Sequence, residues 1–214
     1  MNTHNINIAN QYNEIYKSFD ISRVRIWNNV KLFLSHYNKY DNLLDCGCGN
    51  GKNMIYANEL GYNCEGYDIS TNLLNICISK NLNVHYCDVL NMNLDKKYDK
   101  IISIAVLHHL ETPEDQILAI NNLLKCLNTN GKLLVSFWSK ETKFNNATNT
   151  KNNNDYRNFD KGPNYVDWKL DKKTIIKRYY YIHDHESILE LINKVNVEYT
   201  ITWELQNWFI IFYK

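Results

Sequence analysis

The chain has little proline, almost no net charge and no long apolar run. Only two prolines occur among its 214 residues, and 24 basic side chains oppose 23 acidic ones. The resulting charge of +1 gives no strong overall field, so any site for an anion has to be local. Residues 1–16 lack the apolar stretch of a secretory signal, and no apolar run approaches membrane-spanning length. These absences argue against a membrane protein and favour the cytoplasm, with the nucleus as an alternative compartment.

Cysteine occurs six times, but without the spacing of a zinc site or of a disulfide framework. Cys46 and Cys48 form one C-x-C pair, and no second pair stands at zinc-like spacing from it. In a chain without a signal sequence, reduced thiols in apolar segments are the ordinary state. The sequence therefore predicts no metal site. Asparagine makes up about a sixth of the chain, which we interpret as a background bias that enlarges loops.

Strand-like and helix-like segments alternate between residues 41 and 138. Five apolar runs bounded by turn residues have the length of strands: NLLDCG, NCEGYDIS, NVHYCDV, KIISIAVL and GKLLVSFW. The helical stretch 113–128 begins with a threonine cap, proline at the first helical position and acids in the first turn. Two more strand-like runs, VEYTITWE and NWFIIFYK, end the chain. The sequence predicts an α/β, Rossmann-like fold, with a mainly parallel seven-stranded sheet and helices on both faces.

We expect one domain over residues 1–214, because this length supports one full core and no internal repeat is present. Four parts are predicted within it. Residues 10–40 are amphipathic helices, and residues 41–138 form the nucleotide-binding core. Residues 139–163 are polar, rich in asparagine and aperiodic, which is typical of a mobile loop. Residues 164–214 return to an ordered pattern and form a substrate-side segment.

A glycine-rich turn follows the first predicted strand, in the stretch LLDCGCGNGK. Gly47, Gly49 and Gly51 give the pattern G-x-G-x-G. A dinucleotide fingerprint is G-x-G-x-x-G and would need its third glycine where Lys52 stands. In a doubly wound fold this turn lies at the carboxyl edge of the sheet, where ligands bind. The departure favours S-adenosylmethionine, which lacks a pyrophosphate but has a cationic methionine end, a ribose diol and an adenine.

An acidic residue stands at the end of each of the first three predicted strands. Asp45, before the glycine turn, suits the cationic methionine end, and Asp68, 17 positions after Gly51, suits the ribose diol. Asp88 suits the adenine amino group. One such acid is more often a turn cap, but three beside a glycine turn favour a nucleotide-like cofactor. Neighbours on the same turns complete the predicted cofactor site: Cys48, Lys52, Ile69, Val89 and Ala105.

Several short motifs together resemble one enzyme family. They are LLDCGCGNGK, ISIAVLHHLETPEDQ with its His108–His109 pair, YNEIYKSFDISRVRIW with Arg23 and Trp27, YVDWKL, RYYYIHDHESILELI and NWFIIF. In this combination, which spans nearly the whole chain, the sequence resembles the eukaryotic tRNA methyltransferases that esterify 5-carboxymethyluridine at the wobble position of the anticodon. It departs from the family pattern at 129–131, where a proline-glycine-glycine turn is usual, and at Tyr181, where a histidine is usual.

The resemblance implies methyl transfer from S-adenosylmethionine to a carboxylate. A carboxylate is already ionised at neutral pH, so the reaction needs positioning and exclusion of water rather than a general base. We expect Arg23 and Arg178 to orient the carboxylate through their planar guanidinium groups. Adjacent histidines point to different sides, so only one is expected to face the methyl group, and His108 is preferred.

Further residues are expected on the substrate side, where aromatic rings would hold unstacked anticodon bases and lysines would contact phosphates. They are His109, Trp168, Lys172, Lys173, Lys177, Tyr179, Tyr180, Asn207 and Trp208. Each has an ordinary alternative. Tryptophan is usually a core residue, a run of tyrosines can be a strand with alternating faces, and a group of lysines is usually a solvated surface.

The resemblance also implies two partners: the anticodon stem-loop of tRNA, and a small zinc-binding activator protein that forms a heterodimer with the methyltransferase. The strand NVHYCDV is expected at the edge of the sheet, where unpaired backbone groups can receive another chain. Two other functions remain open from the residues alone. They are methyl transfer to a small molecule, and a non-catalytic methyltransferase-like scaffold.

Overall fold

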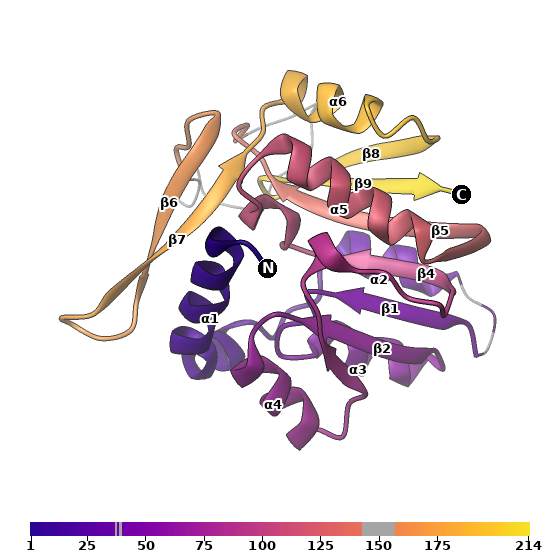
Figure 1. Ribbon diagram of the computed structural model, residues 1–214, viewed down its shortest axis with the longest axis horizontal. Coiled ribbons are helices and arrows are strands. Elements are labelled where there is room, and N and C mark those ends of the chain that lie inside the picture. Colours follow the sequence, from indigo (N-terminus) through magenta and orange to yellow (C-terminus); the bar gives the residue numbers. More distant parts are fainter. Residues whose placement is uncertain (37, 39, 143–156) are drawn as a thin grey trace.

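A seven-stranded sheet forms the centre of the molecule (Figure 1). The computed structural model describes residues 1–36, 38, 40–142 and 157–214. The strand order is β3-β2-β1-β4-β5-β9-β8, and β9 runs antiparallel to both of its neighbours. The predicted Rossmann-like, mainly parallel sheet is therefore confirmed. Its strands are β1 (Asn42–Cys46), β2 (Asn63–Asp68), β3 (Val84–Tyr86), β4 (Tyr98–Ser103), β5 (Leu127–Trp138), β8 (Tyr199–Glu204) and β9 (Asn207–Tyr213).

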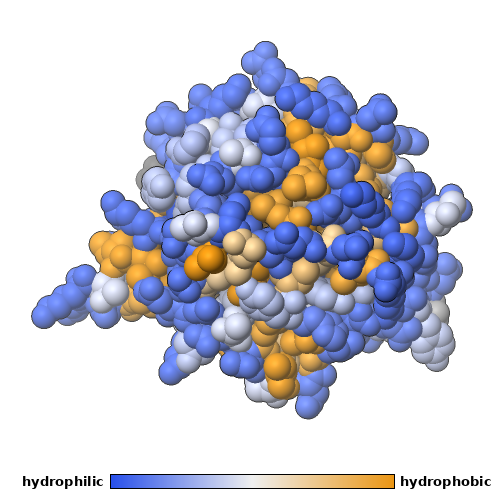
Figure 2. Space-filling view, viewed as in Figure 1, coloured by the Kyte–Doolittle hydropathy of each residue, from blue (hydrophilic) through white to orange (hydrophobic). Residues whose placement is uncertain are grey.

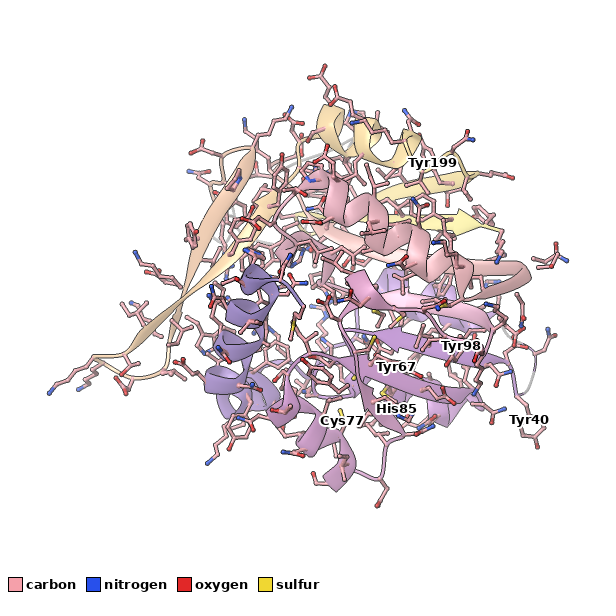
Figure 3. All side chains as sticks on the ribbon, in the orientation of Figure 1. Tyr40, Tyr67, Cys77, His85, Tyr98 and Tyr199 are labelled. Atoms are coloured by element: carbon pink, nitrogen blue, oxygen red, sulfur yellow. The ribbon has the colours of Figure 1, made fainter. Side chains whose placement is uncertain are left out.

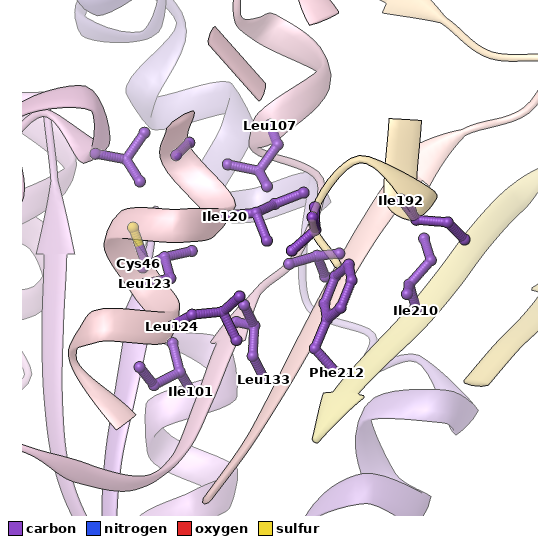
Figure 4. Close-up of a cluster of buried hydrophobic side chains, with 14 of the residues drawn as sticks. Cys46, Ile101, Leu107, Ile120, Leu123, Leu124, Leu133, Ile192, Ile210 and Phe212 are labelled. Carbon is purple, nitrogen blue, oxygen red and sulfur yellow. The ribbon is translucent and has the colours of Figure 1, made fainter. Parts of the chain in front are cut away.

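Helices cover both faces of this sheet, as predicted. On one face α5 (Pro113–Lys125) and α6 (His185–Asn193) enclose the larger apolar core, part of which Figure 4 shows between α5 and the strands. On the other face α2 (Asn28–Ser35) and α3 (Lys52–Leu60) bury a second cluster. None of the helices in the described part of the chain is long and apolar enough to cross a membrane.

The helix at the amino terminus is longer than predicted and covers the ligand edge of the sheet. α1 spans Thr3–Ser22, so it begins before residue 10, where the sequence pattern placed the first helix. Asn2 caps it, because its side-chain oxygen accepts a hydrogen bond from the Asn5 backbone at 2.8 Å. α1 lies against α4 (Thr71–Ser79) and β7 (Ile175–Ile182). These contacts place one helix across the carboxyl ends of the first strands (Figure 1).

A two-stranded hairpin that the sequence pattern did not predict projects from the body of the molecule (Figure 1). It pairs β6 (Gly162–Lys169) with β7 in antiparallel register. Asp171 closes its tip, since its carboxylate accepts the backbone N–H groups of Lys173 and Thr174 at 2.7 Å each. The tip is hydrophilic (Figure 2). Of the predicted loop 139–163, residues 143–156 lie outside the described residues.

Candidate active site

The glycine turn joins β1 to α3 and needs glycine for both backbone and packing reasons. Gly47 and Gly51 have φ angles of 76° and 77°, in the left-handed region that side chains disfavour. A Cβ on Gly47 would lie 2.2 Å from Cγ2 of Val106, and one on Gly51 would lie 2.2 Å from Cδ1 of Leu82. The atoms that pass close to this turn are therefore the protein's own. Gly51 precedes α3 directly and does not line the cavity described next.

A cavity of about 500 Å³ opens at the carboxyl ends of the parallel strands, with α1 along one side. It takes its walls from the glycine turn, from the ends of β2 and β4, and from β7. Most residues that the sequence predicts for cofactor and substrate line this one space. They are Arg23, Gly47, Cys48, Gly49, Lys52, Asp68, Ile69, Asp88, Val89, Ala105, His108, His109, Arg178, Tyr180 and Asn207.

Asp45 lies beneath the glycine turn and does not itself line the cavity. Its side chain is 1% exposed, and neither carboxylate oxygen has a hydrogen-bond partner among the described residues. Burial, followed by the neighbouring charge of Asp68, raises the pKa of this carboxyl to about 7, and the nearby Lys52 charge and Asn53 amide oppose the shift only in part. Burying an ionised carboxyl without a partner destabilises the folded protein, and a positive charge close to the turn would offset that destabilisation. The arrangement fits the predicted cationic end of the cofactor.

Asp68 ends β2 and reaches the wall of the cavity. Its two oxygens accept the backbone N–H groups of Gly49 and Ser70, each at 2.8 Å. Burial raises the pKa of this carboxyl, although these hydrogen bonds oppose the shift. Lys52 lies nearby and donates to the backbone oxygen of Arg25 at 2.8 Å. Asp68 therefore holds the glycine turn in place and leaves a fixed acceptor at the position predicted for a ribose diol.

Asp88 is occupied by a group that the sequence did not point to. The side-chain amide of Asn5, on the first turn of α1, donates to both carboxylate oxygens at 3.0 and 2.9 Å. Asp88 also caps the short helix η1 (Val89–Asn91) through the backbone N–H of Leu90 at 3.1 Å. The Asn5 amide is chemically similar to the adenine amino group predicted for this place. Asp88 is thus placed as expected, with an internal donor already bound to it.

Both histidines of the pair line the cavity, so the prediction that only one would face it is wrong. They belong to the short helix η2 (Leu107–His109), and their rings pack edge to face with centres 4.6 Å apart. His108 accepts a hydrogen bond from the Trp138 backbone N–H on Nδ1, at 3.3 Å. Its Nε2 has no partner among the described residues. Burial holds the pKa of His108 well below its usual value, so the ring is neutral and carries its proton on Nε2.

His109 has the opposite tautomer because its partners differ. Its Nδ1 donates to the backbone oxygen of Tyr179 at 2.7 Å, which leaves Nε2 to accept the hydroxyl of Tyr12 at 2.8 Å. Burial lowers the pKa of His109 to about 3. With both of its nitrogens engaged, His109 is a structural wall residue. His108 is the histidine with a ring nitrogen that has no partner among the described residues, so it stays the preferred candidate for contact with the methyl group.

All four arginines of the chain line this cavity. Arg178 is 3% exposed, and its Nε has no hydrogen-bond partner among the described residues. Burial, and then the charge of Arg178, lower the pKa of Arg23. None of the ion pairs in the described part of the chain involves an arginine. These guanidinium groups lie close together and form no ion pair with an acidic side chain in the described part of the chain. Their positive charge is therefore uncompensated, and an anionic ligand would neutralise it.

Trp168 supports the two predicted catalytic arginines and does not form a wall of the cavity. The guanidinium carbons of Arg23 and Arg178 lie 4.9 and 4.7 Å from the centre of its ring. Its indole nitrogen donates to the hydroxyl of Ser18 on α1 at 2.9 Å. The prediction that Trp168 stacks directly on a base is therefore corrected: its ring positions guanidinium groups.

Two predicted substrate residues lie elsewhere. Trp208, on β9, is 1% exposed because its side chain packs in the larger apolar core, which α5 and α6 cover. Tyr179 points away from the cavity, and its hydroxyl donates to the backbone oxygen of Glu111 at 2.7 Å. Its neighbours on β7, Arg178 and Tyr180, face the cavity since side chains alternate along a strand.

The three predicted substrate lysines are exposed on the projecting hairpin, outside the cavity. Lys172 and Lys173 lie at its tip, and Lys177 lies on β7 opposite Asp167. Apart from Trp168, Tyr179 and Trp208, the structure separates the predicted substrate residues into two groups. One group lines the cavity, and the lysines form an exposed basic extension that can contact a large ligand only outside it.

Several cavity residues were not predicted from the sequence. Arg25, Arg157 and Trp138 line the cavity, together with Asn5 and Tyr12 of α1. One signal could have found the arginines. They are four in a chain with 24 basic residues, and arginine is the residue suited to bidentate recognition of an anion.

Residues 18–190 match the model of a methyltransferase domain family. This match covers more than half of the chain, which therefore belongs to that family. The predicted class, an S-adenosylmethionine-dependent methyltransferase, is confirmed. The residues around the cavity are compatible with this cofactor. A buried carboxyl lies below the glycine turn, a fixed carboxylate lies at the end of β2, and a third carboxylate, bound to the Asn5 amide, lies at the end of β3.

Named relatives confirm the resemblance found in the sequence. The tRNA (carboxymethyluridine(34)-5-O)-methyltransferase of Xenopus tropicalis is 34% identical over 135 residues, covering 62% of this chain and 21% of that protein. The Arabidopsis thaliana protein of the same name is 36% identical over 135 residues, covering 61% and 32%. A protein of Encephalitozoon cuniculi named as a methyltransferase is 28% identical and covers 84% of this chain and 81% of its own length. The chain spans 21% and 32% of the length of the first two relatives.

Solved structures agree on the fold. The CcbJ methyltransferase from Streptomyces caelestis superposes with a TM-score of 0.71 at 11% identity, over 97% of both chains. The methyltransferase DhpI, in complex with S-adenosylhomocysteine, gives a TM-score of 0.69 at 10% identity over 96% of this chain and 94% of that one. At these identities the likeness establishes the fold alone, and it agrees with the predicted Rossmann-like methyltransferase architecture.

Proposed function

We propose that this protein methylates the carboxylate of 5-carboxymethyluridine at the wobble position of tRNA and forms the methyl ester. The observation that carries the proposal is the gathering of all four arginines in one cavity without an acidic partner in the described part of the chain. Such a site attracts a planar anion. The relatives named for this reaction supply the specific substrate, and their likeness covers the methyltransferase domain.

The chemistry requires no proton transfer. S-adenosylmethionine supplies an activated methyl group, one carboxylate oxygen takes that group, and neutral S-adenosylhomocysteine leaves. Arg23 and Arg178 lie over the same indole ring and would hold the carboxylate between them. His108 is neutral and offers an N–H on Nε2. It can donate a hydrogen bond to the carboxylate without taking a proton, which suits a nucleophile that is already ionised.

The hairpin supports a macromolecular substrate. Lys172, Lys173 and Lys177 are exposed beyond the cavity on a projecting arm, where they can follow a phosphate backbone. A small-molecule methyltransferase would have no use for basic residues so far from the reacting atoms. The uridine would enter the cavity as an unstacked base while the stem remains on the surface.

Methylation of purified tRNA would test this proposal. The protein is incubated with labelled S-adenosylmethionine and tRNA that carries 5-carboxymethyluridine, and the nucleosides are separated by mass spectrometry. We expect one methyl group on that nucleoside, removable by mild alkali because it is an ester. Asp68→Ala, prepared identically, controls for contaminating enzymes since it removes a cofactor acceptor. Label that resists alkali, or no label in tRNA from cofactor-binding protein that was co-expressed with the activator proposed below, would contradict the assignment.

We further propose that a small zinc-binding activator protein pairs with this chain along β3. β3 is the edge strand of the sheet, and its last residue, Tyr86, is 53% exposed. Tyr67 and His85 lie side by side near the same edge, with ring centres 5.1 Å apart (Figure 3). An edge strand with apolar neighbours offers backbone groups and contact area to an incoming strand.

Co-expression would test the pairing. The isolated protein is expected to be poorly soluble or weakly active, and the activator should restore both properties. Tyr86→Asp should abolish co-purification. Leu118→Asp, on α5 and 45% exposed, should leave it unchanged. Full solubility and activity of the isolated protein would rule out the requirement.

A further inference from the structure

Arg157 lies apart from the other guanidinium groups of the cavity. Arg23 and Arg178 are both associated with the ring of Trp168, at 4.9 and 4.7 Å. The guanidinium carbon of Arg157 instead lies 4.8 Å from the ring centre of Trp138. Trp138 in turn stacks on Tyr180, with ring centres 4.1 Å apart and an angle of 20° between planes. Arg157 and the Arg23–Arg178 pair are thus held on different aromatic rings.

Arg157 is held by its backbone as well as by this ring. The side-chain amide of Gln206 donates to the backbone oxygen of Arg157 at 2.6 Å and accepts its backbone N–H at 3.2 Å. Gln206 is 9% exposed, so this two-point contact is largely shielded from water. The distance between the two residues in the chain is 49 positions. This tertiary contact therefore fixes the position of the Arg157 backbone.

The turn that presents Gln206 is strained. Leu205 and Gln206 are the two residues between the paired ends of β8 and β9, at Glu204 and Asn207. Their φ angles are 47° and 65°, where glycine or asparagine is the usual choice. Leu205, Gln206 and Asn207 all line the cavity. A strained backbone persists only where surrounding contacts stabilise it. Here the strained turn places the Gln206 amide against the backbone of Arg157.

The positive charge of the arginines in the cavity is more than one anion can neutralise. The Arg157 side chain reaches solvent, and partial burial of its guanidinium group, together with the charges of Arg178 and Arg23, lowers the pKa of that group. Arg178 is deeply buried and has a free Nε. One carboxylate held between Arg23 and Arg178 would leave Arg157 unneutralised on its separate ring. A nucleotide brings a second anion, its phosphodiester group, which stays hydrated and would lie at the mouth.

From this arrangement we infer that Arg157 forms a subsite for the backbone phosphate of the target nucleotide, with Gln206 as its positioning residue. The inference rests on the proposed function, because it assigns the second anion of the same substrate. It explains why an exposed arginine is fixed at two points rather than left free in solvent. It also predicts that the cavity distinguishes a nucleotide from the corresponding nucleoside, although both carry the reacting carboxylate.

Direct binding separates this inference from the proposed reaction. Dissociation constants are measured by calorimetry, with S-adenosylhomocysteine present, for 5-carboxymethyluridine and for its 3′,5′-bisphosphate. The wild-type protein should bind the bisphosphate about tenfold more tightly, the scale of one charge-assisted hydrogen bond. Arg157→Gln should erase that preference, and it should weaken binding of the nucleoside by a much smaller factor than binding of the bisphosphate. Because no methyl transfer is measured, failure of the reaction and failure of the subsite are distinguishable.

Two further variants refine the test. Gln206→Gly keeps the left-handed turn without strain but removes the amide, so it should lose most of the preference for the bisphosphate while nucleoside affinity is retained. Lys125→Gln removes an exposed charge at the end of α5 and serves as the matched control with an unchanged preference. Three results would overturn the inference: no preference in the wild type, an undiminished preference in Arg157→Gln, or an equal loss for both ligands in that variant.

Discussion

Replacing Asp45 by asparagine should stabilise the protein without cofactor, and the gain should grow with pH. The folded protein holds a proton on this carboxyl up to a pKa of about 7, whereas the ordinary value is 3.8. Folding therefore takes up a proton in the window between these values. The free energy of unfolding falls as pH rises from 3.8 to about 7 and then levels off, because burial of the charged form outweighs its favourable interactions with Lys52 and Asn53. Asparagine does not titrate and escapes this loss.

The size of the effect follows from the two pKa values. Fully developed, the difference corresponds to about 4 kcal/mol, and between roughly pH 5 and pH 8 about 2.5 kcal/mol of it should appear. Urea denaturation followed by tryptophan fluorescence, on wild type and Asp45→Asn at both pH values, measures it. The advantage of the variant should increase by that amount from the lower to the higher pH. Asp95→Asn, at an exposed position, serves as the control.

The same variant should bind S-adenosylmethionine more weakly. A cation above the glycine turn favours the charged form of Asp45, so wild-type affinity should rise as pH increases through about 7, and Asp45→Asn should lose this rise. Stability and binding would then change in opposite directions at one residue. If the variant shows the same stability difference at both pH values, Asp45 is already ionised or already paired, and the reasoning about this carboxyl fails.

Other residues give separable outcomes. Arg178→Lys keeps the charge but loses the planar fork, so turnover at saturating tRNA should fall at least about tenfold while cofactor affinity stays constant; normal turnover would limit Arg178 to a phosphate contact. Asp68→Ala should weaken S-adenosylmethionine by roughly 1.5–3 kcal/mol in calorimetry, and an unchanged constant would remove the ribose assignment. Lys172→Gln with Lys173→Gln should lower the salt dependence of tRNA binding by about one unit of slope for each phosphate that a lysine no longer neutralises. Trp208→Ala should cost roughly 3–5 kcal/mol of stability, since Trp208 is core and not a base platform.

The sheet and the cofactor half of the site were predictable because their signals are local. The glycine turn and the acids Asp45, Asp68 and Asp88 each follow a strand directly, so knowledge of the strands places all of them at one edge. The seven strands were recognisable as short apolar runs. The length of α1 was not, because its first turn is polar and is held by contacts with Asp88 and the His109 backbone, far away in sequence.

The substrate half was less predictable because it depends on pairing and distant contacts. A sequence pattern does not say which face of β7 meets the cavity, so Tyr179 and Tyr180 looked equivalent. Trp208 looked like a platform because nothing local shows that helices cover this face of β9. The contact of Arg157 with Gln206 joins two segments that share no pattern. Only the folded chain brings such residues together.

Helix α1 makes the two halves of the cavity mechanically dependent on each other. It spans about 30 Å as a single rod of 20 residues, with Asn5 on Asp88 near its start and Arg23 at its carboxyl-terminal cap. An adenine amino group that uses Asp88 must compete with the Asn5 amide, and any movement of α1 that accompanies this exchange also moves Arg23. Cofactor and substrate affinities are then thermodynamically linked. The factor by which bound cofactor raises the affinity for substrate must equal the factor by which bound substrate raises the affinity for cofactor.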